Sequence, residues 1–374
     1  MIQESTLEKS IELVVGIAAA DAAKVDASSA FPRRSIEALA SEGLLALTAS
    51  IEVGGGGEGM RSAASVVEGL ARSCASTAMV VMMHYCAVAV MEAHAPVKVR
   101  REVAEGSKLG TLAFSEAGSR SHFWAPLSTA TAQGDQILLE ADKSWVTSSG
   151  EADLYVWSSR PVTAEGVSSL WLVHAGTDGV AVGADFNGLG MRGNASRPMS
   201  ARGAAIPKSA QLGPDGGGFD IMMGVVLPWF QVLNAAVSIG IAESAVEKTA
   251  AHAGAARFAH LNQTLAEQPV NRHHIARMRI LTDQAKALLL ETLNSIEASR
   301  LDAQLKVLEV KASASEAAIA VTDLAMRVCG GAAFRKEVGV ERNFRDARAA
   351  TVMAPTTDVL YDFIGKAVCG LPLF

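Results

Sequence analysis

His84 is a titratable side chain in an otherwise apolar stretch, Thr77 to Ala93, whose pattern predicts a helix buried on most faces. An imidazole titrates near neutral pH, so it can relay a proton during a reaction. The alternative is a core histidine bonded to a backbone carbonyl, and both interpretations stay open. Asn234 lies in an uncharged run, Ile221 to Ala242, where its amide could hydrogen-bond a substrate carbonyl or only an adjacent helix.

Several well-known kinds of site are excluded by missing motifs. There is no GxGxxG opening a helix after a strand, no GxxxxGK[ST] and no GxSxG, which argues against a Rossmann nucleotide site, a P-loop and a nucleophile elbow. His273 and His274 have no carboxylate or cysteine at ligand spacing, so a surface pair is expected rather than a metal site. The four cysteines form no CxxC pair and are expected to be reduced thiols of a cytoplasmic protein: Cys74, Cys86, Cys329 and Cys369.

Composition places the chain among large globular proteins. Of its 374 residues, 49% are hydrophobic and 19% charged, and 33 basic against 39 acidic residues give a net charge of −6. No basic stripe could follow a phosphate backbone, so nucleic-acid binding is not expected. The first residues lack the pattern of a secretory signal. The run from Ile221 to Ala242 contains Pro228, Gln231 and Asn234, which favours a buried core helix over a membrane span, and no membrane association is expected.

Hydrophobic periodicity divides the chain into three parts. Residues 1–110 predict an N-terminal helical domain, 111–215 a central, mostly antiparallel β domain of short strands, and 216–374 a bundle of long helices. The segment Val53–Met60 (VGGGGEGM) is too rich in glycine for a regular element. It is either a flexible connector or a place where the backbone approaches a ligand closely.

Four motifs carry a resemblance to a known family. LAFSEAGSRS (112–121) resembles a "TEP-GSD" segment, KSWVTSSG (143–150) a "K-x-W-I-T-N" strand, CGG (329–331) a "GG-G" turn and VERNFRDAR (340–348) "VER-x-x-RDAR". In this order they identify the chain as a member of the acyl-CoA dehydrogenase superfamily. The resemblance implies that superfamily's α+β fold, with an N-terminal helical domain, a central antiparallel β domain and a C-terminal four-helix bundle. It also implies bound FAD and a small-molecule substrate, a CoA thioester.

The resemblance assigns FAD contacts to residues of these motifs. Trp145 would lie against the isoalloxazine, with β-domain core as its alternative, and the Thr147 hydroxyl would bond near flavin N5. Arg257 would reach the FAD pyrophosphate of a neighbouring subunit of a homodimer or homotetramer, or would be a solvated cation at a helix end. The other implied FAD contacts are Leu112, Phe114, Ser115, Ser121, Gly330, Gly331, Thr356 and Asp358.

The carboxylate that removes the substrate's α-proton is missing from its usual places. The family's two base positions correspond here to Ala354 and Phe230, and neither side chain accepts a proton. This favours a flavin-dependent oxygenase that uses O2 and a flavin reductase. His84 and Asn234 would be its hydrogen-bond donors, and His122, Phe230 and Ala354 would line the substrate pocket.

Two alternatives remain. One is genuine acyl-CoA dehydrogenation with a relocated base and an electron-transfer flavoprotein as partner. The other is a non-catalytic subunit that binds FAD or acyl-CoA.

Overall fold

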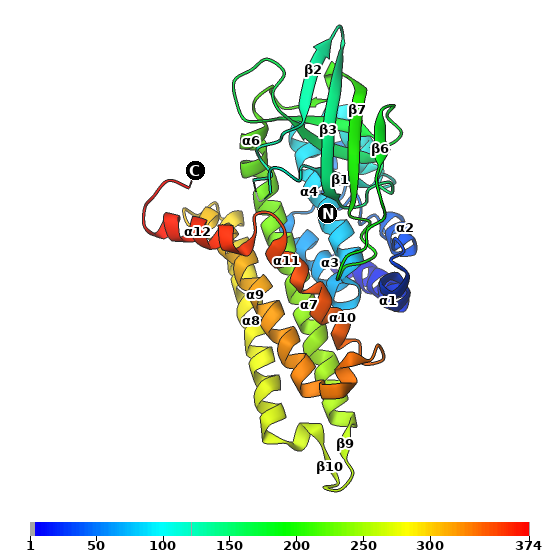
Figure 1. The fold of residues 1–374 in the computed structure, drawn as a ribbon, viewed down its shortest axis with the longest axis vertical. Coiled ribbons are helices and arrows are strands. Elements are labelled where there is room, and N and C mark those ends of the chain that lie inside the picture. Colours follow the sequence, from blue (N-terminus) through cyan, green and yellow to red (C-terminus); the bar gives the residue numbers. More distant parts are fainter. Residues whose placement is uncertain (1–3, 121, 374) are drawn as a thin grey trace. The chain divides into compact units, whose positions relative to one another are not determined.

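The computed structural model describes residues 4–120 and 122–373 (Figure 1). Its backbone forms two compact units. The first comprises Met1–Val66, Ser76–Asn187 and Arg192–Phe230, and the second comprises Val67–Ala75, Gly188–Met191 and Gln231–Phe374.

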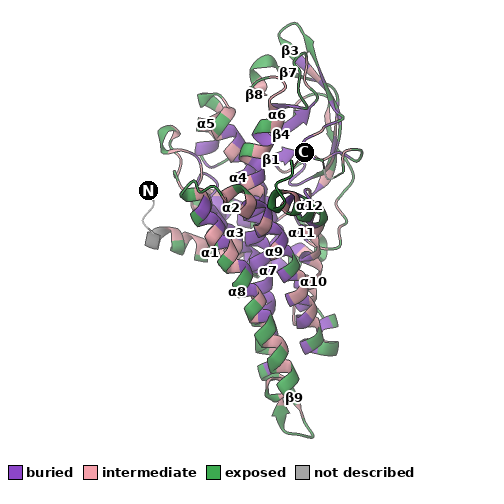
Figure 2. Ribbon diagram, turned by 90° about the vertical axis from the view of Figure 1, so that its left-hand side faces the viewer, coloured by how far each residue is buried: buried purple, intermediate pink, exposed green. Residues whose placement is uncertain are grey.

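The first unit contains the N-terminal helices. The predicted helix Thr77–Ala93 is confirmed as α4, Ala75–His94, and it is buried on nearly every face (Figure 2) because its residues are apolar all round. The remaining helices in this part of the sequence are α1 (Glu4–Ser28), α2 (Arg33–Ser41), the short 3₁₀ turn Ile51–Val53, α3 (Met60–Ser73) and α5 (Val97–Ala104).

The glycine-rich segment Val53–Met60 is packed against the backbone that precedes it. The Gly56 N–H donates to the carbonyl of Ala46 at 3.0 Å, and the Gly57 N–H donates to that of Ala49 at 2.8 Å. A Cβ atom at Gly55 would lie 2.3 Å from the Ala49 carbonyl oxygen. The close approach that requires glycine here is therefore to the chain itself.

Two four-stranded sheets form the β part of the first unit. One has the order β1-β4-β5-β8, with strands Gly110–Ala113, Leu154–Ser159, Ser169–His174 and Gln211–Leu212. The other has the order β2-β3-β7-β6, with strands Thr129–Gln133, Gln136–Val146, Arg197–Pro207 and Val180–Val182. All pairs in these two sheets are antiparallel except β1 with β4, which run parallel; the chain between them, which includes the β2–β3 hairpin, supplies the crossover that parallel neighbours require.

The second unit is built on long helices. The main helices are α7 (Leu227–Ala255), α8 (Pro269–Glu297), α9 (Ala303–Cys329) and α12 (Thr357–Val368), with short elements α10 (Val340–Asp346) and α11 (Arg348–Val352) before the last. A short loop joins α8 to α9, so the two pack antiparallel. The last part of α3, from Val67 on, also belongs to this unit, and Gly240 of α7 lies against it, since a Cβ there would lie 2.5 Å from the carbonyl oxygen of Glu68.

Three helices within the described residues are long and apolar enough to cross a membrane: Ala75–His94, Gly218–Ala255 and Ala303–Phe334. The second includes α6 (Gly218–Ile221) and a π-helical turn, Met222–Val226, before α7. Of their most apolar windows, 89%, 78% and 44% respectively is buried inside the protein. The burial of the second favours the interpretation of Ile221–Ala242 as a core helix.

Candidate functional site

An exposed tryptophan stands at the end of β3. Trp145 is 69% exposed and touches Phe186 edge to face, with ring centroids 6.3 Å apart. Its backbone has a φ of 57°, a left-handed conformation that costs free energy in any residue with a side chain. The interpretation of Trp145 as β-domain core is therefore wrong. The strained backbone leaves the indole available to a flat ligand.

The turn after Trp145 contains three buried hydroxyl groups, two of which have no hydrogen-bond partner among the described residues. Thr147 is buried, and its Oγ1 lies 3.2 Å from the Ser196 hydroxyl. The hydroxyl oxygens of Ser148 and Ser149 are buried without a hydrogen-bond partner among the described residues. Buried hydroxyls normally find partners, so this turn has the hydrogen-bonding capacity that a bound polar molecule would use.

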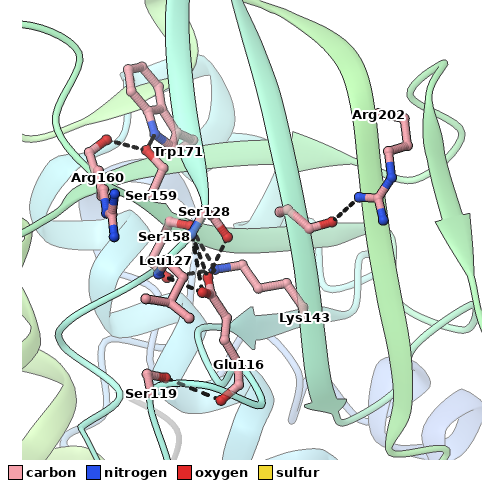
Figure 3. Close-up of polar contacts among 11 residues, drawn as sticks. Glu116, Ser119, Leu127, Ser128, Lys143, Ser158, Ser159, Arg160, Trp171 and Arg202 are labelled. Atoms are coloured by element: carbon pink, nitrogen blue, oxygen red, sulfur yellow. Dashed lines mark hydrogen bonds and ion pairs between the residues drawn. The ribbon is translucent and has the colours of Figure 1, made fainter.

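A buried ion pair joins the first two sequence motifs (Figure 3). The Lys143 ammonium donates to Glu116 Oε1 at 2.6 Å, to the Ser158 carbonyl at 2.7 Å and to the Ser158 hydroxyl at 2.9 Å. Glu116 also accepts from the backbone N–H groups of Leu127, at 2.6 Å, and Ser128, at 3.1 Å, and from the Ser128 hydroxyl. The pair thus holds the segment after β1 against β3, next to Trp145.

The two charges of this pair stabilise one another. Burial on its own would raise the pKa of Glu116, but the Lys143 charge and the hydrogen bonds outweigh it and lower that pKa. Burial lowers the pKa of Lys143 to about 8, against the opposing attraction of Glu116. Both groups are therefore charged at neutral pH, and each would be costly to bury without the other.

Lys143 and Glu116 belong to two of the sequence motifs, but no contact between them was predicted from the sequence. The alternation of β3 contained the signal, because Leu139, Ala141 and Lys143 follow one another at every second position and all are buried. A lysine on the buried face of a strand requires a buried acceptor. Nothing in the pattern of β3 identifies Glu116 as that acceptor.

The remaining predicted FAD contacts of the first unit are placed as follows. Leu112 and Phe114 are buried, and Phe114 stacks on Phe123 with centroids 6.5 Å apart. The Ser115 carbonyl accepts a hydrogen bond from the Ser144 N–H at 2.8 Å, so Ser115 lies beside the strand that carries Trp145. Ser121 lies outside the described residues.

The two predicted histidines of the first unit lie in different surroundings. His122 is exposed, and its ring contacts that of Trp124 with centroids 5.0 Å apart. His84 is fully buried, its Nδ1 accepts from the Gly110 N–H at 3.0 Å, and its Nε2 donates to the Leu45 carbonyl at 2.7 Å. Burial lowers its pKa to about 4. A neutral ring with a hydrogen bond at each nitrogen fits the interpretation of His84 as a core histidine and not as a proton relay.

The segment at the first expected base position is held by a lysine of α9. Lys311 is fully buried and donates to the carbonyls of Met353 at 2.8 Å and Pro355 at 2.6 Å, on either side of Ala354. Burial lowers the pKa of Lys311 to about 7. The amide of Asn234 donates to Met353 Sδ at 3.3 Å, so it contacts this same segment. Ala354 itself is half-buried and supplies no proton acceptor.

Three further predicted residues lie at the start of α12 or in the first turn of α7. Thr356 precedes α12 as its N-cap, and Asp358 is exposed in the first turn of that helix. Phe230, the second expected base position, is a half-buried residue of α7.

The residues predicted to contact FAD at a subunit boundary are exposed. Arg257 lies in the short strand β9 (Arg257–Phe258) after α7, and its guanidinium donates to Asn262 at 3.3 Å. Gly330 and Gly331 open the 3₁₀ turn Gly330–Phe334, and a Cβ at either glycine would meet nothing within 4 Å. Both glycines present open backbone at the surface of the chain.

Three models of one protein family match successive parts of the chain. Family models described as the N-terminal, middle and C-terminal domains of acyl-CoA dehydrogenase match residues 4–104, 111–203 and 216–369. The human mitochondrial short-chain specific acyl-CoA dehydrogenase is 28% identical over 351 residues, which cover 90% of this chain and 83% of that protein.

Two solved structures have the same fold. Butyryl-CoA dehydrogenase from Megasphaera elsdenii has a TM-score of 0.90 at 21% identity and 99% coverage of both chains. An FAD complex of PigA has a TM-score of 0.89 at 19% identity, covering 99% of this chain and 97% of that one. Because the three domain models together span most of the sequence, the predicted fold is confirmed, and the chain belongs to the acyl-CoA dehydrogenase family.

Proposed function

We propose that this chain is an FAD-dependent oxidoreductase that acts on an acyl thioester, with α,β-dehydrogenation as its reaction. The observation that carries the proposal is the turn at the end of β3. There the indole of Trp145 is exposed on a strained backbone, and the buried hydroxyls of Ser148 and Ser149 have no partner within the described part of the chain. Such a turn offers a flat apolar face and polar groups to one planar heterocycle. The FAD complex among proteins of this fold supports the choice of cofactor.

Bound FAD supplies a two-electron acceptor for the hydrogen that leaves the substrate's β-carbon. The protein's part is to hold the ring and the thioester. Trp145 and Thr147 would contact the ring, and the Lys143–Glu116 pair fixes the backbone that carries them. In the second unit, Lys311 positions the Met353–Pro355 segment. The human relative, named as a short-chain specific acyl-CoA dehydrogenase, supports the thioester as substrate and dehydrogenation as the reaction.

Ala354 favours a second candidate function, oxygenation of the thioester or a related apolar substrate. Dehydrogenation requires an acceptor for the α-proton, and a general base contributes ~10²–10⁴-fold to such a step. Neither Ala354 nor Phe230 can act as that acceptor. A relocated base would reconcile the chain with dehydrogenation, whereas an oxygenase would need none at the α-carbon.

One anaerobic experiment separates the two. The purified protein is expected to be yellow and to release FAD on denaturation, and saturated acyl-CoAs of increasing length are then mixed with it without oxygen. Bleaching of the flavin with formation of the 2-enoyl thioester supports dehydrogenation. No bleaching, together with incorporation of ¹⁸O from ¹⁸O2 after reduction by an external donor, supports oxygenation. A protein that cannot be reconstituted with FAD contradicts both.

A variant at the expected base position makes the test sharper. Ala354→Glu places a carboxylate on the segment that Lys311 holds, and Ala354→Gln adds the same bulk without a proton acceptor. If dehydrogenation lacks only a strong base, Ala354→Glu should raise the anaerobic rate of flavin reduction by ~10²–10⁴-fold over Ala354→Gln. Equal rates in the two variants would argue against dehydrogenation at this site.

We further propose a cytoplasmic homodimer or homotetramer that exchanges electrons with an electron-transfer flavoprotein or a flavin reductase. Large apolar side chains of the second unit support self-association, since Phe334 is 84% exposed and Val352 is 74% exposed. Sedimentation of the purified protein tests the assembly, and a homogeneous monomer that retains FAD would contradict it.

A further inference from the structure

Three polar side chains on one face of α7 are buried and have unmet hydrogen-bonding capacity. Gln231, Asn234 and Ser238, here called the α7 polar row, are 0%, 2% and 1% exposed. Both amide atoms of Gln231, the Oδ1 of Asn234 and the hydroxyl of Ser238 have no partner among the described residues. Spacings of three and four residues place neighbours in the row one above the other along the helix.

The row lies among apolar residues of the same helix. From Gln231 to Ala242 every residue of α7 is buried, and most are apolar, as in an ordinary core helix. Buried polar atoms are nearly always paired, because leaving them unpaired forfeits their hydration without replacement. Two buried threonines of α8 follow this rule, because the hydroxyls of Thr282 and Thr292 donate to the carbonyls of Met278 and Leu288.

The row adjoins the segment at the expected base position. Asn234 uses its Nδ2 on Met353, the residue whose carbonyl is held by Lys311, and keeps its Oδ1 unused. The unmet capacity therefore includes both donors and acceptors. Asn234 offers an acceptor, Gln231 offers one of each, and Ser238 can act as either.

The charges around the row restrict what it can bind. The row itself has no charge, and the Lys311 ammonium already donates to two backbone carbonyls. A carboxylate in the row would give up its hydration without a strong ionic partner, whereas a hydroxyl or carboxamide exchanges hydrogen bonds without that cost. We propose that the α7 polar row binds a neutral hydroxyl or carboxamide on the acyl part of the substrate, an inference that rests on the proposed function.

The test compares matched thioesters by equilibrium binding. Butyryl-, hexanoyl- and octanoyl-CoA are titrated calorimetrically into the FAD-loaded protein beside thioesters of the same length bearing a terminal hydroxyl, a terminal carboxamide or a terminal carboxylate. At one chain length at least, the hydroxyl or carboxamide compound should bind about tenfold or more tightly than its hydrocarbon parent. The carboxylate compound should bind no better than the parent.

Variants assign the preference to the row. Gln231→Met keeps the length of the side chain without its polar atoms, and it should abolish the preference while leaving the affinity for the hydrocarbon parent unchanged or improved. Asn234→Leu should reduce the preference as well. Thr282→Val, which removes a buried hydroxyl that already has a partner, is the matched control and should leave the ratio of affinities unchanged.

Two results would overturn the inference. One is that hydrocarbon thioesters bind as tightly as their polar counterparts at every length. The other is a preference that survives Gln231→Met in a protein whose circular dichroism and melting temperature are unchanged, which would mean that groups outside the row bind the hydroxyl or carboxamide. Failure to bind any thioester, hydrocarbon ones included, would instead contradict the proposed function.

Discussion

Removing the lysine of the buried pair should be far more damaging than removing an exposed lysine. In Lys143→Met the side chain keeps its bulk, but Glu116 stays buried beside Ser158 with its ionic partner gone. Three hydrogen bonds from neutral donors remain to support the carboxylate: those of the Leu127 N–H and of the N–H and hydroxyl of Ser128. Breaking a buried pair in this way costs about 3–5 kcal/mol, a large share of the ~5–15 kcal/mol that stabilises a typical domain.

The unfolding free energy lost in Lys143→Met should become smaller as the pH is lowered. In the native protein the pKa of Glu116 is lowered, so its contribution to stability is present above the unfolded value of 4.5 and is lost as the pH falls through the folded pKa. Without Lys143 the pKa of Glu116 rises, and the variant protonates Glu116 at a higher pH than the wild type does. The difference in unfolding free energy between the two proteins should therefore shrink as the pH is lowered from 7 to about 4.

Urea unfolding of the two proteins at several pH values measures this difference. Lys108→Met is the matched control, because Lys108 pairs with Asp153 at 3.4 Å with both side chains partly exposed, and its loss should cost less than about 1 kcal/mol. The double variant Lys143→Met/Glu116→Gln should be more stable than Lys143→Met alone. A cost below 1 kcal/mol for Lys143→Met, or a cost that does not change with pH, would refute the reasoning.

Three further predictions concern other parts of the chain. Burial lowers the pKa of Lys311 from 10.5 to about 7, so between pH 7 and 9 the unfolded chain binds a proton at this lysine that the folded chain has released. The free energy of unfolding in urea should therefore rise over this pH range, and the rise should be smaller in Lys311→Met. Arg257→Ala should weaken FAD retention by about 1.5–3 kcal/mol in equilibrium dialysis if its guanidinium makes a charge-assisted contact. Arg272→Ala is the control and should have no effect, because Arg272 is an exposed arginine of α8 whose guanidinium already donates to the Ala266 carbonyl. Gly55→Ala should lower the unfolding free energy by about 1–3 kcal/mol, because its methyl group would clash with Ala49. Gly16→Ala, at an exposed position of α1 with open space around it, should raise the unfolding free energy by about 0.5–1 kcal/mol. Equal effects of the two substitutions would show that the glycine-rich segment moves to accommodate the methyl group.

The sequence was sufficient where a signal is local. The apolar run that became α4 and the motifs that identify the family depend on neighbouring residues alone, and both predictions are confirmed. The exposure of Trp145 was not predictable from its type, because tryptophan is normally buried and only its left-handed backbone turns the indole outward.

Features that depend on distant partners were not predictable. His84 has a fixed role because Leu45 and Gly110, far from it in sequence, occupy its two nitrogens. The parallel pairing of β1 with β4 likewise joins strands that are about 40 residues apart in the sequence, and the pattern of each strand does not show which other strand it pairs with. The unpaired atoms of the α7 polar row are visible only when every neighbour is known.

The packing of the glycine-rich segment has a consequence for limited proteolysis. Stretches such as Val53–Met60 are usual sites of nicking because proteases need an extended, mobile backbone. Here the N–H groups of Gly55, Gly56, Gly57 and Glu58 all donate to carbonyls of residues 46–50. A protease could bind this stretch only after those hydrogen bonds open, so the most glycine-rich part of the chain should resist cleavage until its part of the fold opens.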